Sequence, residues 1–121
     1  MAAQPLLSPE PLALEINGTS YQPLLTGTPQ TRGMRSGSVV LAPGADCGEH
    51  STKSHEETLV FLRGAGIVRL VGHEPLEVGA GRIAYIPPHT THNVVNTGAE
   101  PLAYVYVVAP VASAEGGAAA P

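Results

Sequence analysis

The sequence predicts an all-β protein, a single antiparallel sandwich or barrel with little or no helix. Apolar runs of four to eight residues recur along the chain, whereas no helical period is sustained over ten residues. The 14 glycines and 12 prolines are spread along the sequence, which indicates many turns. Hydrophobic residues form 43% of the 121 residues, which is enough for the core of one domain of this length.

Each expected strand is a short run of apolar or β-favouring residues bounded by turn residues. In chain order the first strands are 13–16 (ALEI), 21–24 (YQPL), 38–41 (SVVL) and 57–62 (ETLVFL). The remaining ones are 66–71 (GIVRLV), 74–78 (EPLEV), 82–86 (RIAYI), 92–96 (HNVVN) and 102–108 (LAYVYVV). The turns between strands fall at Asn17-Gly18, Pro43-Gly44, Gly64, Gly72-His73, Gly79–Gly81, Pro87-Pro88 and Thr97-Gly98. Short strands at this regular spacing are typical of a sandwich or barrel.

The expected domain occupies residues 13–110. Residues 1–12, with three prolines, are expected to form an extended arm, and the small residues of 111–121 a flexible tail. The longest expected loop is 26–37, whose Arg32 and Arg35 either reach the mouth of a pocket or are solvated.

Composition excludes several classes of protein. The formal net charge is −4 and the six basic residues are scattered singly, which argues against binding to nucleic acid or to an anionic membrane. The single cysteine, Cys47, excludes an internal disulfide and fits a reducing compartment. No secretory signal or bilayer-spanning apolar run is visible, so we expect a cytoplasmic protein.

Three side chains have the chemistry of a metal site. His50, Glu57 and His92 would supply two imidazoles and one carboxylate, a set that binds divalent transition metals. Strand alternation puts Glu57, Leu59 and Phe61 on one face and places His92 on the face of Val94. If these faces point inward, the ligands lie in an apolar pocket.

The spacing of these residues resembles the two motifs of the cupin superfamily, of the small conserved-barrel type. The first motif, G-x5-H-x-H-x3,4-E-x6-G, fits Gly44, His50, Glu57 and Gly64. The second motif, G-x5-P-x-G-x2-H-x3-N, fits Gly81, Pro87, His92 and Asn96. The resemblance covers about residues 38–108 and implies a double-stranded β-helix, or jelly roll. Since cupins commonly pair through edge strands, it also implies a homodimer.

Two positions depart from the family pattern. Thr52 stands where the second histidine of the first motif is expected, and His89 stands where the second motif has glycine. The usual cupin ligands are three histidines and one glutamate, so His50, Glu57 and His92 form a reduced set. His55, on the face of Glu57, would be a substitute ligand or an acid/base beside the metal; the alternative is an exposed hairpin residue near the rim. Thr52 could hold a metal-bound water.

The sequence leaves the function of such a cupin open. The leading hypothesis is a metal-binding single-domain cupin that binds a small organic molecule; if it turns that molecule over, it is an enzyme of the dioxygenase or isomerase kind. Its metal would be iron, manganese, zinc or nickel, held by His50, Glu57 and His92, with His55 moving protons. The alternative is a non-catalytic module that binds or senses a sugar or organic acid, suggested by the missing histidine and by the lack of an obvious arginine next to the ligands. A purely structural barrel is a third reading, because the fold by itself carries little functional information.

Overall fold

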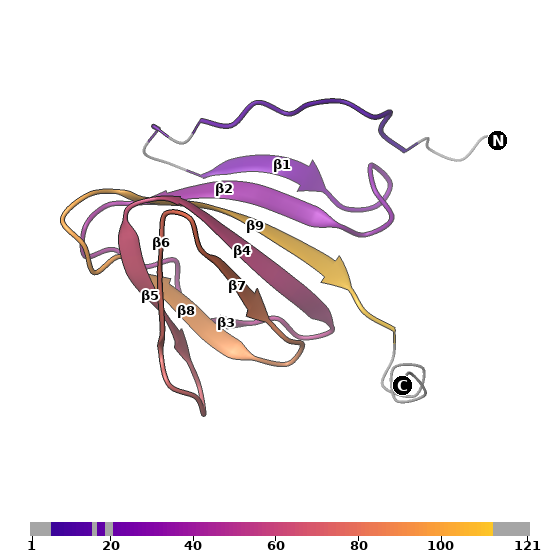
Figure 1. The fold of residues 1–121 in the computed structure, drawn as a ribbon. Coiled ribbons are helices and arrows are strands. Elements are labelled where there is room, and N and C mark those ends of the chain that lie inside the picture. The colour runs from indigo at the N-terminus through magenta and orange to yellow at the C-terminus, as the bar shows by residue number, and fades with distance from the viewer. Residues whose placement is uncertain (1–5, 16, 19–20, 113–121) are drawn as a thin grey trace.

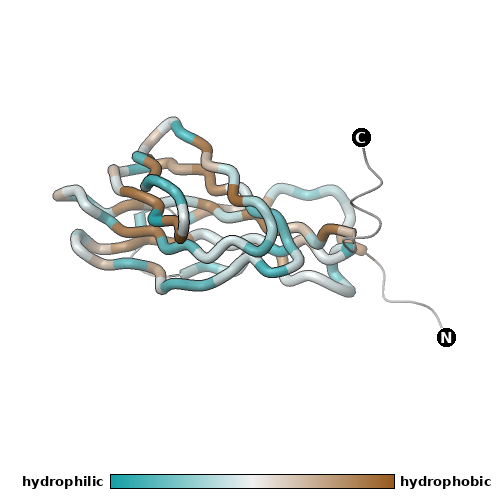
Figure 2. Tube along the Cα trace, turned by 90° about the horizontal axis from the view of Figure 1, so that it is seen from below, coloured by the Kyte–Doolittle hydropathy of each residue, from teal (hydrophilic) through white to brown (hydrophobic). Residues whose placement is uncertain are grey.

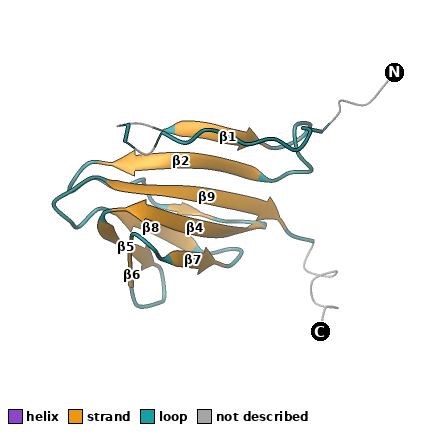
Figure 3. Ribbon diagram, turned by 45° about the horizontal axis from the view of Figure 1, so that its top comes forward, coloured by secondary structure: helices purple, strands orange, loops and turns teal. Residues whose placement is uncertain are grey.

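The structure, a computed structural model, describes residues 6–15, 17–18 and 21–112. Within this part the chain forms strands and loops and contains no helix, so the all-β prediction is confirmed (Figure 3). The strands are β1 (Gln22–Thr26), β2 (Arg35–Leu41), β3 (His50–Ser51), β4 (His55–Arg63), β5 (Ala65–Leu70), β6 (Leu76–Gly79), β7 (Ile83–Ile86), β8 (Thr91–Val95) and β9 (Leu102–Pro110). No helix in the described residues is long and apolar enough to cross a membrane.

The strands form two antiparallel sheets that face one another (Figure 1). The larger sheet has the strand order β1-β2-β9-β4-β7, and the smaller one has the order β3-β8-β5-β6. Apart from the consecutive pairs β1-β2 and β5-β6, neighbouring strands in each sheet are not consecutive in the sequence, as in a jelly roll. The hydrogen-bonded ladders do not close into one continuous barrel, so the fold is two facing sheets with a core between them.

The core lies between the sheets because alternate residues of each strand point inward. Leu59 and Phe61 of β4 are each 1% exposed, and Val68 and Val94 of the smaller sheet meet them with 0% and 1% exposure. Hydrophobic and hydrophilic residues are interspersed along the chain in Figure 2. The inward position of Glu57, two residues before Leu59, follows from this same alternation.

The N-terminal region differs from the expected strand at 13–16. Residues 13–15 form no strand, and residue 16 lies outside the described residues. The segment 6–15 instead runs beside β1 (Figure 1), where the side-chain amide of Gln22 donates to the Ala13 carbonyl and its oxygen accepts the Glu15 N–H. The expected tail falls mainly on residues 113–121, which lie outside the described part.

Two further boundaries differ from the sequence prediction in ways that affect the site. β2 begins at Arg35 rather than at Ser38, so the expected loop 26–37 ends earlier. The two-residue strand β3 was not predicted, because a run this short has no recognisable alternation. These two strands place Arg35 and His50, among other residues, at the cavity described next.

Candidate metal centre

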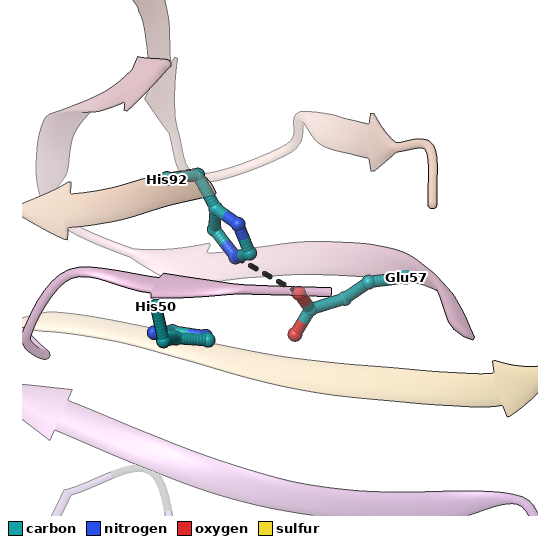
Figure 4. A group of neighbouring side chains, drawn as sticks. All are labelled: His50, Glu57 and His92. Atoms are coloured by element: carbon teal, nitrogen blue, oxygen red, sulfur yellow. Dashed lines mark ion pairs between the residues drawn. The ribbon is translucent and has the colours of Figure 1, made fainter. Parts of the chain in front are cut away.

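The three predicted metal ligands come together from three strands (Figure 4). His50 of β3 and His92 of β8 are directly opposite one another in the smaller sheet, and Glu57 reaches them from β4 of the larger sheet. One potential ligand atom of each residue lies within 4.8 Å of those of the other two. Within the described residues, this is the only such group of three or more His, Cys, Asp or Glu side chains.

Glu57 and His92 are in direct contact. Oε1 of Glu57 lies 3.0 Å from Nε2 of His92, and both side chains are buried. Burial lowers the pKa of His92, but the hydrogen bond with Glu57, the bond with the Thr90 carbonyl and the charge of Glu57 together raise it above its usual 6.5. A proton on Nε2 therefore stabilises this buried pair when no other cation lies between the two groups.

Backbone carbonyls orient both imidazoles. Nδ1 of His92 lies 3.0 Å from the Thr90 carbonyl, and Nδ1 of His50 lies 2.9 Å from the Gly48 carbonyl. Because a carbonyl only accepts, Nδ1 is the protonated nitrogen in each ring, and the neutral ring keeps a lone pair on Nε2. Histidines that bind metals are held in this way, by a hydrogen bond from the second ring nitrogen. The donor set and its orientation thus fit a divalent transition metal.

The three residues line one cavity of about 320 Å³. The apolar side chains of Leu59, Val94 and Val108 form part of its wall, and Tyr104 and Tyr106 also line it. Such surroundings lower the local dielectric constant and strengthen electrostatic contacts with the ligands. The cavity is large enough for a small organic molecule next to the three candidate ligands.

His55 and Thr52 also line this cavity, but in different ways. His55 is half-buried at the start of β4 and does not belong to the group of three. The Thr52 hydroxyl donates to the Pro87 carbonyl over 2.7 Å and accepts the Thr90 N–H over 3.0 Å. Its only hydrogen is therefore already used to hold the Pro87–Thr90 loop, and it cannot donate to a metal-bound water at the same time.

The sequence left open whether Arg35 reaches a pocket or is solvated, and the structure places it at the cavity. It lines the same cavity as His50, Glu57 and His92, whereas Arg32 lines a separate one beside the N-terminal segment. From the sequence, no arginine was expected next to the ligands, and this favoured a sensor. The structure instead places Arg35 at the same cavity as the ligands. The sequence signal that could have placed Arg35 in a strand is its alternation with Gly37, Val39 and Leu41. Ser36 and Ser38 obscured this signal because they made the segment resemble a loop.

The other polar residues of the two motifs and their turns lie outside the group of three ligands. Asn96 is 1% exposed, and its side chain donates to the Leu41 and Glu100 carbonyls and accepts the Gly98 N–H, which joins the loop after β8 to the end of β2. Cys47 is half-buried at the cavity and packs against the core. His73 and His89 are both exposed, and His89 has a φ of 55°.

Comparison with known proteins gives the family. The sequence profile of the cupin domain matches residues 37–108, more than half of the chain. The chain is a member of the cupin family. None of the curated proteins matches this cupin in sequence.

Solved structures agree with this cupin assignment. An RmlC-like cupin protein with a double-stranded β-helix fold from Methanocaldococcus jannaschii superposes with a TM-score of 0.72 at 19% identity, over 86% of this chain and 93% of that one. A Cupin 2 conserved barrel domain protein from Salinispora arenicola gives 0.64 at 26% identity, over 86% and 89%. The Cnp3 cupin domain of Schizosaccharomyces pombe gives 0.67 at 18% identity over 75% of this chain, which spans only 64% of that structure. The double-stranded β-helix expected from the motifs is thereby confirmed.

Proposed function

We propose that this cupin binds a divalent transition metal through His50, Glu57 and His92 and uses it to act on a small organic molecule in the adjoining cavity. The observation that supports the proposal is the convergence of these three side chains, from two facing sheets, to within 4.8 Å at that cavity. Two imidazoles and a carboxylate suit iron, manganese, zinc or nickel. When bound, such a metal supplies a Lewis acid or a site of oxygen activation with open positions for substrate.

The protein's own residues would have distinct roles. Glu57 supplies the negative charge of the ligand set. A metal cation that replaces the proton between Glu57 and His92 would offset the free-energy cost of burying this carboxylate. The Thr90 and Gly48 carbonyls keep Nε2 of the two histidines available. His55 lies two residues before Glu57 on the same face of β4 and lines the same cavity, which supports a role in moving protons to or from a bound molecule.

One observation favours the alternative, a cupin that binds or senses a small ligand without turnover. The Thr52 hydroxyl is committed to Pro87 and Thr90, so nothing at that position completes the usual four-ligand set. A three-ligand site holds its metal less tightly. In this alternative the cavity recognises a sugar or an organic acid, and the residues in it serve binding alone.

Metal binding is tested by metal analysis and calorimetry on matched variants. Wild-type protein should take up about one equivalent of Zn(II) or Mn(II), and Glu57→Gln should lose most of that affinity. Glu56→Gln is the matched control, because Glu56 is the neighbouring carboxylate on the outer face of β4 and accepts a hydrogen bond from the exposed Tyr85. Wild-type protein that binds neither metal, or equal binding by both variants, would contradict the proposal.

A second measurement separates the enzyme from the binding module. Protein reconstituted with Fe(II) under anaerobic conditions is mixed with small organic acids and sugars, and oxygen uptake and products are followed. Turnover that disappears in His92→Ala and falls in His55→Ala supports the enzyme. A ligand-induced rise in melting temperature without any product, across the same compounds, supports the binding module.

A further inference from the structure

Arg35 and Glu57 lie in one cross-strand row of the larger sheet. Val108 of β9 is paired with Arg35 of β2 on one side and with Glu57 of β4 on the other. The three residues point to the same face, and the backbone positions of Arg35 and Glu57 are two strand spacings apart, or roughly 10 Å. Arg35 therefore stands across the cavity mouth from the metal ligands, at a separation that suits a short molecule.

The charge of Arg35 is not neutralised by the protein. Within the described residues its guanidinium has no ion pair or hydrogen bond, whereas Arg63 donates to the Asn17 side chain and Arg82 to the Glu77 carbonyl. Its stem packs over Gly27, where an added Cβ would lie 3.1 Å from Cγ of Arg35. Gly27, with a φ of 89°, thus leaves room for the arginine stem.

Much of the cavity wall is apolar. Val108 lies between Arg35 and Glu57 in the cross-strand row, and Val39, Leu59 and Val94 also line the cavity, while Tyr106 lies beside Arg35. The volume of about 320 Å³ limits a bound molecule to a small size. The cavity therefore combines one cation at its mouth, apolar residues in its wall and the three candidate metal ligands.

We propose that Arg35 is a substrate-binding residue and that this cupin takes a small monocarboxylic acid. The carboxylate pairs with the Arg35 guanidinium, and a hydroxyl or keto oxygen elsewhere on the same molecule faces His50, Glu57 and His92. A planar guanidinium matches a carboxylate through two parallel hydrogen bonds. A phosphate is less suited, because Arg35 is the only arginine or lysine among the described residues that line the cavity, and the chain has a net charge of −4. This inference rests on the proposed function for the role of the metal end.

The test measures binding rather than turnover. Zn(II)-loaded protein is titrated by calorimetry with acetate, 2-hydroxybutyrate and 2-oxobutyrate, with the neutral amide of 2-hydroxybutyrate, and with inorganic phosphate. The variants are Arg35→Gln, Arg35→Lys and the matched control Arg32→Gln, whose side chain lines the other cavity. Zinc affinity is measured for each variant first, and the titrations are repeated on metal-free protein.

At least one acid should bind, and Arg35→Gln should weaken its binding about 10- to 100-fold, the range for a lost charge-assisted hydrogen bond. Arg35→Lys should have a smaller effect, Arg32→Gln none, and the amide should bind weakly to every variant. Failure of all three acids to bind, equal affinity in Arg35→Gln and Arg32→Gln, or stronger binding of phosphate than of the acids would overturn the inference.

The two proposals fail in different ways. If zinc does not bind, the proposed metal function fails, and the Arg35 dependence of acid binding in metal-free protein still decides the inference. If zinc binds with the expected Glu57 dependence and the acids show no Arg35 dependence, the substrate class alone is wrong.

Discussion

Oε1 of Glu57 lies 3.0 Å from Nε2 of His92, and the two residues come from opposite sheets of the molecule. Their contact joins β4 to β8 across the interior, next to the most buried part of the core. A carboxylate and an imidazole that are both buried need a cation between them, either a proton or a metal. Competition between a proton and a metal for the Glu57–His92 pair underlies the first two predictions.

The stability of the metal-free protein should depend on pH through His92. Its pKa is raised above 6.5 in the folded state, so the native protein binds this proton more tightly than the unfolded chain. The resulting stabilisation should be fully present below about pH 6.5 and be lost as the pH rises through the folded pKa. Urea unfolding at a series of pH values checks this. Glu57→Gln should abolish this dependence and Glu56→Gln should keep it.

Metal should stabilise the protein, and more so at higher pH. A metal at 100 times its dissociation constant adds about 2.7 kcal/mol to the free energy of unfolding if it binds only the folded state. Affinity should rise with pH, because Nε2 of His92 must lose its proton to bind. The melting temperature with Zn(II), and after its removal by a chelator, measures this effect. An unchanged melting temperature would contradict it.

Thr52→Val should destabilise the fold without changing metal affinity. The substitution leaves the Pro87 carbonyl and the Thr90 N–H without their partner, which should lower the free energy of unfolding by about 1–3 kcal/mol. Thr58→Val, on the outer face of β4, is the control and should stay within about 0.5 kcal/mol. Urea unfolding gives the stability, and zinc calorimetry gives the affinity. A marked loss of zinc affinity in Thr52→Val would instead place Thr52 at the metal.

Phe61→Ala should be among the most damaging core substitutions. Phe61 is 1% exposed and packs on Tyr104 with ring centroids 5.2 Å apart, so its truncation should lower the free energy of unfolding by about 3–5 kcal/mol. Ile83→Ala, on the edge strand β7 with 69% exposure, should change it by no more than about 0.5 kcal/mol. Chemical denaturation at low temperature compares the two. Equal losses of stability in the two variants would mean that the outer face of β7, which carries Ile83, is buried in solution.

Much of the fold could be predicted from alternation alone. In β4 every second residue from Glu57 to Phe61 is buried, as the pattern indicated, because a strand between two layers repeats every two residues. The same reasoning failed at β2, where Ser36 and Ser38 are buried at 5% and 1% exposure although they are polar. β2 is a strand because β1 and β9 pair with it on both sides, and local preference does not decide such a position.

The sequence by itself determined the family and the sheet-rich fold and predicted His50, Glu57 and His92 as candidate metal ligands, because motif spacing is a local property of the chain. Only the tertiary structure decided how these residues meet. The pairing of β3 with β8 sets His50 against His92, the packing of the two sheets delivers Glu57 to them, and the ladder from β2 through β9 to β4 aligns Arg35 with Glu57. These relationships join residues far apart in the chain, and they depend on register and sheet packing rather than on any local pattern.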